Sequence, residues 1–381
     1  SIKLGKKDSQ TLIDNLQDII DKKNIPDFFQ WYNSNIDKLN IINCLLSKRR
    51  NQFPNELKKI LKSSTDERKQ LNKLLYDNPF ISIDIHYFAE TNDLIYYNFN
   101  DGNLNLHIYS AEPITNDFIK DLIVICYLME SISSDKLNGI DVRILLSPNK
   151  KKMNYNNVKV LCCQNINSGS SVTHEFVNLW RKEEIHKVLI HELIHCLNID
   201  NFLHYTNKTN NFINNLANKY NVKGKIIPFE AYTDSVAIII HTIFAGFKFM
   251  FNKNDIIDLL STEISFVLFQ AAKILHYFNF SDIDELNSNS NNNKFIEQGT
   301  SVFSYFIIKS SLLFSLDKFL KFSDTNFKFK NRIDDFESLI NYSMNNKDFK
   351  KSINYYINYI KNNKNNKYVY YNLRMSSIQI L

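Results

Sequence analysis

Three side chains in one otherwise apolar segment have the types and spacing to do chemistry together. His191, Glu192 and His195 lie within residues 187–200, KVLIHELIHCLNID. Burying His or Glu without a partner costs free energy, so these side chains need partners in a folded chain. Residues four apart on a helix project from one face, which lets both imidazoles bind one metal ion. Glu192 is turned by about 100° from His191, so it can stand beside that ion as a general base.

The order H-E-x-x-H on a helix is typical of zinc hydrolases. In such a site the two His bind the ion, and the Glu takes a proton from a water molecule that the metal activates. The residues from Val188 to Leu197 are otherwise apolar around almost the whole helix. This predicts a buried helix, which would hold its ligands rigidly. The alternative is a His pair bonded to main-chain carbonyls in a core, but that arrangement gives Glu192 no role.

A catalytic zinc site needs a third protein ligand and keeps one position for water or substrate. Glu230 and Asp234 are four apart in residues 228–241, PFEAYTDSVAIIIH. They therefore share one face of a second predicted helix. We predict that Glu230 binds the metal and that Asp234 accepts a hydrogen bond from a ligand His, fixing its orientation. The alternative is that both carboxylates only favour the N-terminal dipole of a helix that begins at Pro228.

Glu297 is a second candidate for the third ligand. It opens an apolar stretch that predicts a helix over residues 296–316, but the polar run 288–293 separates it from the His pair. A metzincin would carry Gly and a third His at offsets that here hold Asn198 and Asn201. That pattern is therefore excluded.

Hydrolysis through a tetrahedral oxyanion needs a hydrogen-bond donor besides the metal. The candidates are His204, Tyr232, His241 and Tyr305. His241 lies about two turns beyond Asp234 on the same predicted helix face, although a single His on an apolar helix is more often a core residue. The chain has 20 Tyr, so composition does not choose between the two tyrosines.

The elements that must position these residues predict an α+β fold in three parts. Residues 1–76 have the spacing of a helical N-terminal unit, in which the second and third helices begin at Pro26 and Pro54. Residues 77–220 alternate between strands and helices and include the H-E-x-x-H helix, like an α/β subdomain. Residues 221–381 are mainly helical and carry the third ligand.

Within the middle part, alternating residues rich in Ile and Tyr predict strands. The expected strands cover residues 81–88, 93–99, 104–112, 139–148 and 158–166. Asp101-Gly102 predicts a hairpin turn between the second and third of these strands, and residues 116–132 have helical spacing. The first turn of the H-E-x-x-H helix is expected at Trp180–Glu184. Further helices are expected at residues 229–251, 256–278, 296–316 and 349–359.

Composition limits the partners and the compartment. The net charge is +6, but the lysines are scattered among asparagines, so solvated loops are favoured and a nucleic-acid partner is not expected. The longest apolar stretch, Val236–Phe247, is too short to span a membrane, and no membrane partner is expected. Five Cys without a C-x-x-C pair predict reduced thiols and a cytoplasmic, reducing compartment.

A family resemblance rests on H-E-x-x-H followed by a helix with E-x-x-x-D. This combination, within residues 158–240, resembles the gluzincin branch of the zincin metallopeptidases. The resemblance implies that His191, His195 and Glu230 are the zinc ligands. It also implies that Glu192 is the general base and that Asp234 is the carboxylate that supports a ligand His. Many gluzincins have Asn before the ligand Glu, and here the residue is Phe229, so no subfamily is assigned.

The resemblance carries two further expectations. Zincins have an edge strand that pairs with extended substrate, and residues 158–170 are interpreted as that strand, with Gly169 allowing close backbone approach. Residues 165–195 also resemble predicted zincins of large DNA viruses, which implies a virion or an infected host cell.

The predicted function is therefore that of a zinc-dependent peptidase acting on a protein or peptide substrate, with Glu192 as general base. A catalytically inactive zincin-like protein, serving as a binding or scaffold module, is the first alternative. A basic nucleic-acid-associated protein is the second, and it would show steep salt dependence of binding.

Overall fold

The chain folds into an α+β structure. The computed structural model describes residues 16, 26–48, 58–60, 66–76, 78–153, 159–200, 207–290, 293–322, 333–363 and 371–380. Two compact units are present. The α/β unit comprises residues 33–150 and 167–199, and the helical unit comprises the described residues up to Tyr32 together with 151–166 and 200–380. Helix α2 (Pro26–Lys48) contributes residues to both units.

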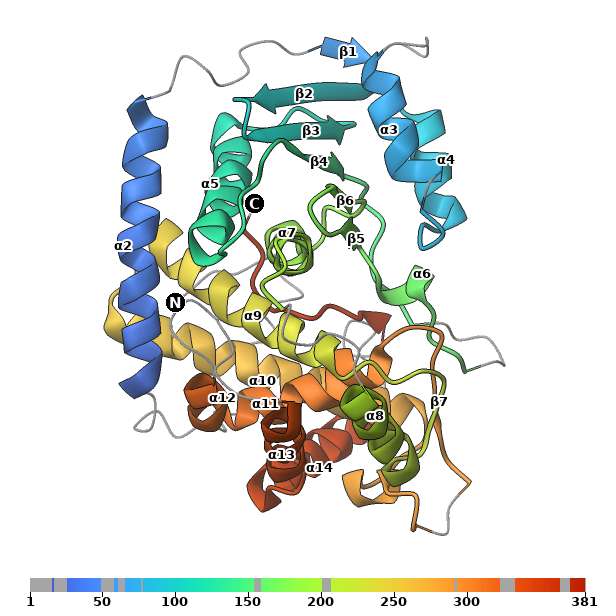
Figure 1. Ribbon diagram of the computed structural model, residues 1–381. Coiled ribbons are helices and arrows are strands. Elements are labelled where there is room, and N and C mark those ends of the chain that lie inside the picture. The colour runs from blue at the N-terminus through green and yellow to red at the C-terminus, as the bar shows by residue number, and fades with distance from the viewer. Residues whose placement is uncertain are drawn as a thin grey trace. The chain divides into compact units, whose positions relative to one another are not determined.

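The α/β unit is built on a six-stranded mixed sheet (Figure 1). Its strands are β1 (Lys58–Ile60), β2 (Leu94–Asn100), β3 (Leu104–Ser110), β4 (Ile140–Leu145), β5 (Gly169–Val172) and β6 (Phe176–Leu179). Their order in the sheet is β1-β2-β3-β4-β6-β5. Strands β3, β4 and β6 are parallel, and the remaining neighbours pair antiparallel. Strand β5 is therefore an edge of the sheet.

The β2–β3 hairpin and the following helix confirm two predictions from local sequence. Gly102 has φ of 85°, a conformation that glycine adopts without steric cost. The Asp101 carboxylate accepts hydrogen bonds from the main-chain nitrogens of Asn103 and Leu104 at 3.1 and 3.0 Å, which closes the turn. Helix α5 (Asn116–Ile132) has the bounds that its apolar spacing predicts.

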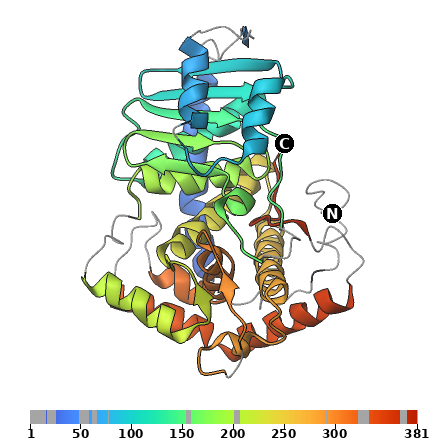
Figure 2. The same cartoon turned by 90° about the vertical axis from the view of Figure 1, so that its right-hand side faces the viewer.

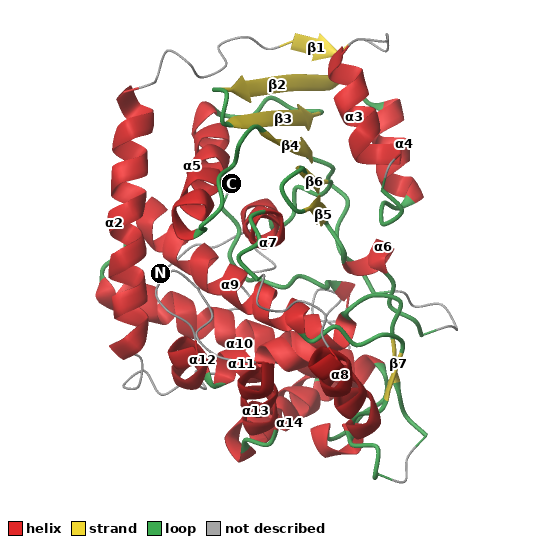
Figure 3. Ribbon diagram, viewed as in Figure 1, coloured by secondary structure: helices red, strands yellow, loops and turns green. Residues whose placement is uncertain are grey.

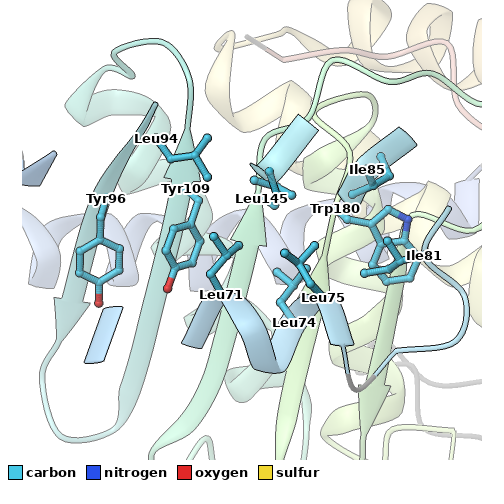
Figure 4. Packing of buried hydrophobic residues seen from close by; sticks show 11 residues of the cluster. Leu71, Leu74, Leu75, Ile81, Ile85, Leu94, Tyr96, Tyr109, Leu145 and Trp180 are labelled. Atoms are coloured by element: carbon cyan, nitrogen blue, oxygen red, sulfur yellow. The ribbon is translucent and has the colours of Figure 1, made fainter. Parts of the chain in front are cut away.

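Helices cover both faces of this sheet. Helices α3 (Asp66–Tyr76) and α4 (Ile83–Thr91) lie on one face, and α5 and α7 (Ile185–Cys196) lie on the other (Figures 1 and 2). Figure 4 shows the apolar contact under α3 and α4, where Leu74 and Ile85 pack against the sheet beside Tyr109 and Trp180. This burial explains why α3 and α4 are held on the sheet.

The structure contradicts two predictions in the N-terminal half. Residues 81–88 were predicted as a strand, but residues 83–91 form helix α4, because Ile81, Ile85 and Ala89 recur every four residues on the buried side. The predicted helix from Pro54 is also wrong in its described part, since Lys58–Ile60 pair with β2 as strand β1. The first helix predicted for the N-terminal unit precedes Pro26 and falls almost wholly outside the described residues.

The region before the H-E-x-x-H helix also differs from the prediction. Residues 159–162 are not a strand, and Cys163–Ile166 form the short helix α6. The edge strand is β5, which joins β6 in a hairpin that sequence reasoning missed. Because β6 ends at Leu179, residues Trp180–Glu184 are not the first turn of α7, which begins at Ile185.

The helical unit consists almost entirely of helices, drawn in red in Figure 3. They are α8 (Asn207–Lys219), α9 (Phe229–Lys248), α10 (Lys253–Tyr277), η4 (Ile283–Leu286), η5 (Phe303–Ile308), α11 (Lys309–Phe314), α12 (Leu316–Phe322), α13 (Ile333–Met344) and α14 (Lys347–Asn362). Asn252 and Asp255 form a capping box that starts α10. The predicted helices at 256–278 and 349–359 are confirmed within a few residues at their ends.

The predicted helix over residues 296–316 is wrong at its start. Ile296–Glu297 form strand β8, which pairs in parallel with β7 (Val222–Lys223). Glu297 is exposed on this strand and does not open a helix. Helical structure begins only near Phe303, whose main-chain nitrogen donates a hydrogen bond to the Gln298 side-chain oxygen at 2.8 Å.

No helix in the described part of the chain is both long and apolar enough to span a lipid bilayer. All five Cys have free thiols, as the spacing of the Cys residues predicts.

Candidate functional site

Helix α7 carries the H-E-x-x-H residues and confirms the predicted helical placement of the motif. It begins after Glu184, whose φ of 59° is left-handed, and the Glu184 carbonyl accepts the first helical hydrogen bond from Val188 at 2.9 Å. Every residue of α7 except His195 is buried. The helix packs on α5 and on strands β5 and β6, so its side chains have little freedom to move.

The rings of the two histidines of α7 lie next to each other. The ring centroids of His191 and His195 are 5.0 Å apart, and the ring planes meet at 80°. His191 is buried and His195 is half-buried. Zinc binds imidazole nitrogen at about 2.0–2.1 Å, and two rings at this separation can each direct a nitrogen to one ion.

Glu192 is seated against the edge strand β5. Ser171 Oγ donates a hydrogen bond to Glu192 Oε2 at 2.8 Å. A Cβ atom at Gly169 would lie 2.6 Å from Glu192 Cγ, closer than real Cβ contacts allow. Glycine at this position therefore allows the close approach that the sequence predicts for Gly169, and the neighbour that comes close is Glu192.

The main chain of β5 presents hydrogen-bonding groups beside Glu192. The Trp180 nitrogen donates to the Ser168 carbonyl at 3.0 Å, and Gly169 is opposite Leu179. In an antiparallel pair, hydrogen-bonded and non-hydrogen-bonded positions alternate. The N–H and C=O groups of Gly169 and Ser171 therefore face away from β6, at the outer edge of the sheet.

Cys196 ends α7 and remains a thiol. Burial raises the pKa of Cys196 to about 11. Its Sγ lies 3.5 Å from the Val172 carbonyl oxygen, to which the thiol can donate. A neutral, buried thiol is a poor nucleophile and a poor metal ligand, so Cys196 contributes packing to this region.

Glu230 and Asp234 lie on α9 in the helical unit, each with a partner from the η5–α11 segment. Helix α9 begins at Phe229 after Pro228, as predicted. Tyr305 Oη donates a hydrogen bond to Glu230 Oε2 at 3.1 Å. Lys309 Nζ is 2.7 Å from Asp234 Oδ2.

Sequence reasoning missed Lys309. The predicted role of Asp234 was to support a ligand His, and that role stays a prediction, whereas the ion pair with Lys309 is a feature of the structure. The signal was present: Lys309 stands alone in the apolar run FSYFIIKSSLLF, residues 303–314. A lysine inside such a helix needs a buried carboxylate.

The other predicted oxyanion donors lie elsewhere in the helical unit. The Tyr232 ring packs on Phe319 and Phe336, with centroids 5.6 and 6.1 Å away. His241 Nδ1 is 3.5 Å from Ser376 Oγ among buried side chains. Tyr305 is the candidate whose hydrogen bond to Glu230 is described above, and His204 falls outside the described residues.

Comparisons with known proteins give one relative and no family. No family model matches the chain, and no solved structure matches it. The chain is 27% identical over 218 residues to the uncharacterized protein R210 of Acanthamoeba polyphaga mimivirus, which covers 55% of this chain. The match spans 53% of that protein, about half its length. The chain thus has a distant relative in a large DNA virus.

Proposed function

We propose that this protein is a zinc-dependent peptidase whose ion is held by His191, His195 and Glu230. Each of these three side chains can offer one ligand atom to a metal ion. Two imidazoles and one carboxylate are a donor set that catalytic zinc sites use, and the set leaves a fourth position for water or substrate. The resemblance to gluzincins implies the same set.

The contacts that hold the Glu192 side chain against β5 are the observation that carries the proposal. A structural zinc site has no use for a carboxylate next to the ligands, yet Glu192 has a hydroxyl donor from Ser171 and a space kept open by Gly169. Both contacts come from β5, the edge strand. We infer that this carboxylate, which shares α7 with the ligand histidines and contacts an edge strand, exchanges protons with a peptide lying along that strand.

The chain's own residues then have the following tasks. When bound, the zinc ion supplies a Lewis acid that polarises the peptide carbonyl and lowers the pKa of water. Glu192 accepts a proton from the attacking water and delivers it to the leaving amine. The Ser171 hydroxyl orients the carboxylate during both transfers, and Tyr305 orients Glu230.

The position of β5 as an edge strand supports an extended peptide as substrate. Gly169 and Ser171 direct their N–H and C=O groups outward, and an added strand would pair with them. Pairing through the main chain would fix a peptide bond beside Glu192 with little dependence on side chains. This favours an endopeptidase that requires an extended, unfolded segment.

Zinc content and peptide cleavage test the proposal. The wild type is expected to bind one zinc ion and cleave members of a broad peptide library. Glu192→Gln should keep the zinc and lose activity by about 10²–10⁴-fold, the usual contribution of a general base. The matched control is Glu175→Gln, because Glu175 is exposed on the β5–β6 turn and should not affect cleavage.

Two results would contradict the proposal. If zinc binds to the wild type but no peptide is cleaved, the chain is a zincin-like binding protein without catalysis. If His191→Ala and His195→Ala bind zinc as the wild type does, these histidines are not ligands.

A further inference from the structure

Two contacts in parallel join α9 to the segment formed by η5 and α11. Glu230 and Asp234 are four residues apart on α9, and Tyr305 and Lys309 are four residues apart on the second segment. Tyr305 Oη donates to Glu230 at 3.1 Å, and Lys309 Nζ reaches Asp234 at 2.7 Å. We call these two contacts the α9 ladder. Because four residues make about one helical turn, both contacts lie on one face of α9.

The Asp234–Lys309 contact is a fully buried ion pair. The side chains of Lys309 and Asp234 are 1% and 0% exposed. Separating buried opposite charges is strongly unfavourable, so the pair tolerates little displacement. It therefore fixes the rotation and axial position of α9 against α11, and Glu230 lies only one turn away.

The π-helix η5 sets the spacing of the ladder on the other side. Tyr305 lies within η5, which continues directly into α11 at Lys309. A π-helix has a wider turn than an α-helix and is frequent at functional sites, where it redirects side chains. The wider turn changes the direction of Tyr305 relative to Lys309, and both side chains then meet carboxylates of the same helix.

Residues 371–380, which form no regular helix or strand after Tyr371, add another acceptor for Lys309. We call this segment the inner strap. The Met375 carbonyl oxygen is 3.5 Å from Lys309 Nζ. Glu263 on α10 holds the next part of the strap, because its carboxylate accepts a hydrogen bond from the Ser377 nitrogen at 2.7 Å.

Helix α10 binds the inner strap mainly through main-chain atoms. Gln270 Nε2 donates to the Arg374 carbonyl at 2.5 Å, and Lys273 Nζ donates to the Asn372 carbonyl at 3.0 Å. Most residues of the strap are buried. Buried donors and acceptors of this kind fix an extended chain in one register, so the position of Met375 beside Lys309 is determined by α10.

We propose that Lys309 is a positioning residue for Glu230 and that the inner strap holds Lys309 in place. The inference rests on the proposed role of Glu230 as a zinc ligand. Productive sites hold their ligands to within about 0.5 Å, and groups that orient a ligand typically account for about 10–100-fold in metal affinity. Lys309 does not contact Glu230 in this proposal. Its ion pair with Asp234 fixes the rotation and axial position of α9, and this in turn fixes the position of Glu230 one turn away.

Zinc affinity and a cobalt spectrum of the full chain test the role of Lys309. Lys309→Met is expected to lower zinc affinity about tenfold or more, measured by competition with a chromophoric chelator. Its Co²⁺-substituted form should have shifted visible absorption bands, because these bands report the arrangement of ligands. Lys309→Arg keeps the positive charge and should recover part of the affinity. Lys318→Met is the matched control, since that side chain is 49% exposed on α12.

Folded Lys309→Met protein with wild-type zinc affinity and cobalt bands would overturn the role of Lys309. If Lys309→Met does not fold, Lys309→Gln replaces it, because glutamine keeps a hydrogen-bond donor for Asp234. Its zinc affinity and cobalt bands are then compared with the wild type in the same way. A wild type that binds no zinc would instead refute the proposed function, and the inference with it. Zinc binding by the wild type therefore separates the two failures.

Glu263→Gln tests the inner strap. The variant should increase hydrogen exchange in residues 371–380 and lower zinc affinity several-fold, because Lys309 loses a fixed acceptor. Faster exchange of the strap with unchanged zinc affinity would overturn its role. The same exchange measurement on the Lys318→Met control should match the wild type.

Discussion

Glu192 illustrates how much a single side chain depends on its immediate neighbours. The motif predicts its role, but its orientation comes from Ser171, which donates at 2.8 Å, and from Gly169, which leaves space for it. A general base contributes only when it is within hydrogen-bond reach of the proton it transfers. Two small residues of β5 are therefore part of the proposed catalytic arrangement, although neither has titratable chemistry.

Gly169→Ala should move Glu192. The added Cβ would be 2.6 Å from Glu192 Cγ and 2.7 Å from its Oε1, so either the side chain or strand β5 must shift. We expect a loss of peptidase activity of at least tenfold, and a loss of about 1–3 kcal/mol in the free energy of unfolding, as for other overpacked sites. Cleavage assays and denaturant titration measure the two effects.

The control for this substitution is Ser170→Ala, because Ser170 is on the opposite face of β5 and donates to no part of Glu192. Its hydroxyl accepts a hydrogen bond from Asn78 at 2.8 Å. If Gly169→Ala is as active as this control, catalysis does not depend on the position that the Glu192 side chain has against Gly169.

At the scale of elements, helix α4 shows that one sequence can satisfy two periodicities. ISIDIHYF alternates apolar and polar residues, as strands do, but Ile81, Ile85 and Ala89 also recur every four residues. Packing against the sheet favours the helical solution. In it, Ile85 is 0% exposed and Ile83 is 80% exposed, whereas a strand would place both on one face.

Alanine substitutions in α4 separate these two structures. Ile85→Ala should lower the free energy of unfolding by about 2–5 kcal/mol, because it leaves a cavity beside Trp180. Ile83→Ala should change it by less than about 0.5 kcal/mol, as is usual for exposed positions. Equilibrium denaturation measures both. Equal losses for the two variants would contradict the helical structure of α4.

At the scale of the whole molecule, the proposed zinc ligands are divided between the two units. His191 and His195 belong to the α/β unit, and Glu230 belongs to the helical unit. A metal that binds only the folded chain stabilises it in proportion to the logarithm of its free concentration. If all three residues are ligands, zinc should therefore stabilise segments of both units.

Removal of zinc tests this coupling. At free zinc about 1,000 times the dissociation constant, binding adds about 4 kcal/mol to the free energy of unfolding, and a chelator should remove this amount. Hydrogen exchange after chelation should increase in both α7 and α9. In Glu230→Ala, the effect of the chelator should become small. An increase confined to α7 would show that Glu230 is not a ligand.

Elements with strong local signals could be predicted from the amino-acid sequence. Helix α5 and the helical structure of α7 follow from apolar spacing over many residues, the start of α9 follows from Pro228, and the β2–β3 turn follows from Asp101-Gly102. Such signals are local because a helix or a tight turn satisfies its own main chain. The candidate chemistry of His191, Glu192 and His195 was predicted in the same way, from spacing along one helix.

Features that depend on contacts distant in sequence became apparent in the three-dimensional structure. The fold of residues 81–91, the edge position of β5 and the partners Ser171 and Lys309 all depend on segments far away in the chain. Asp234 and Lys309 are separated by 75 residues, and no periodicity in either segment specifies the other. Local patterns fix which face of an element is apolar, whereas packing alone fixes which polar groups meet across it.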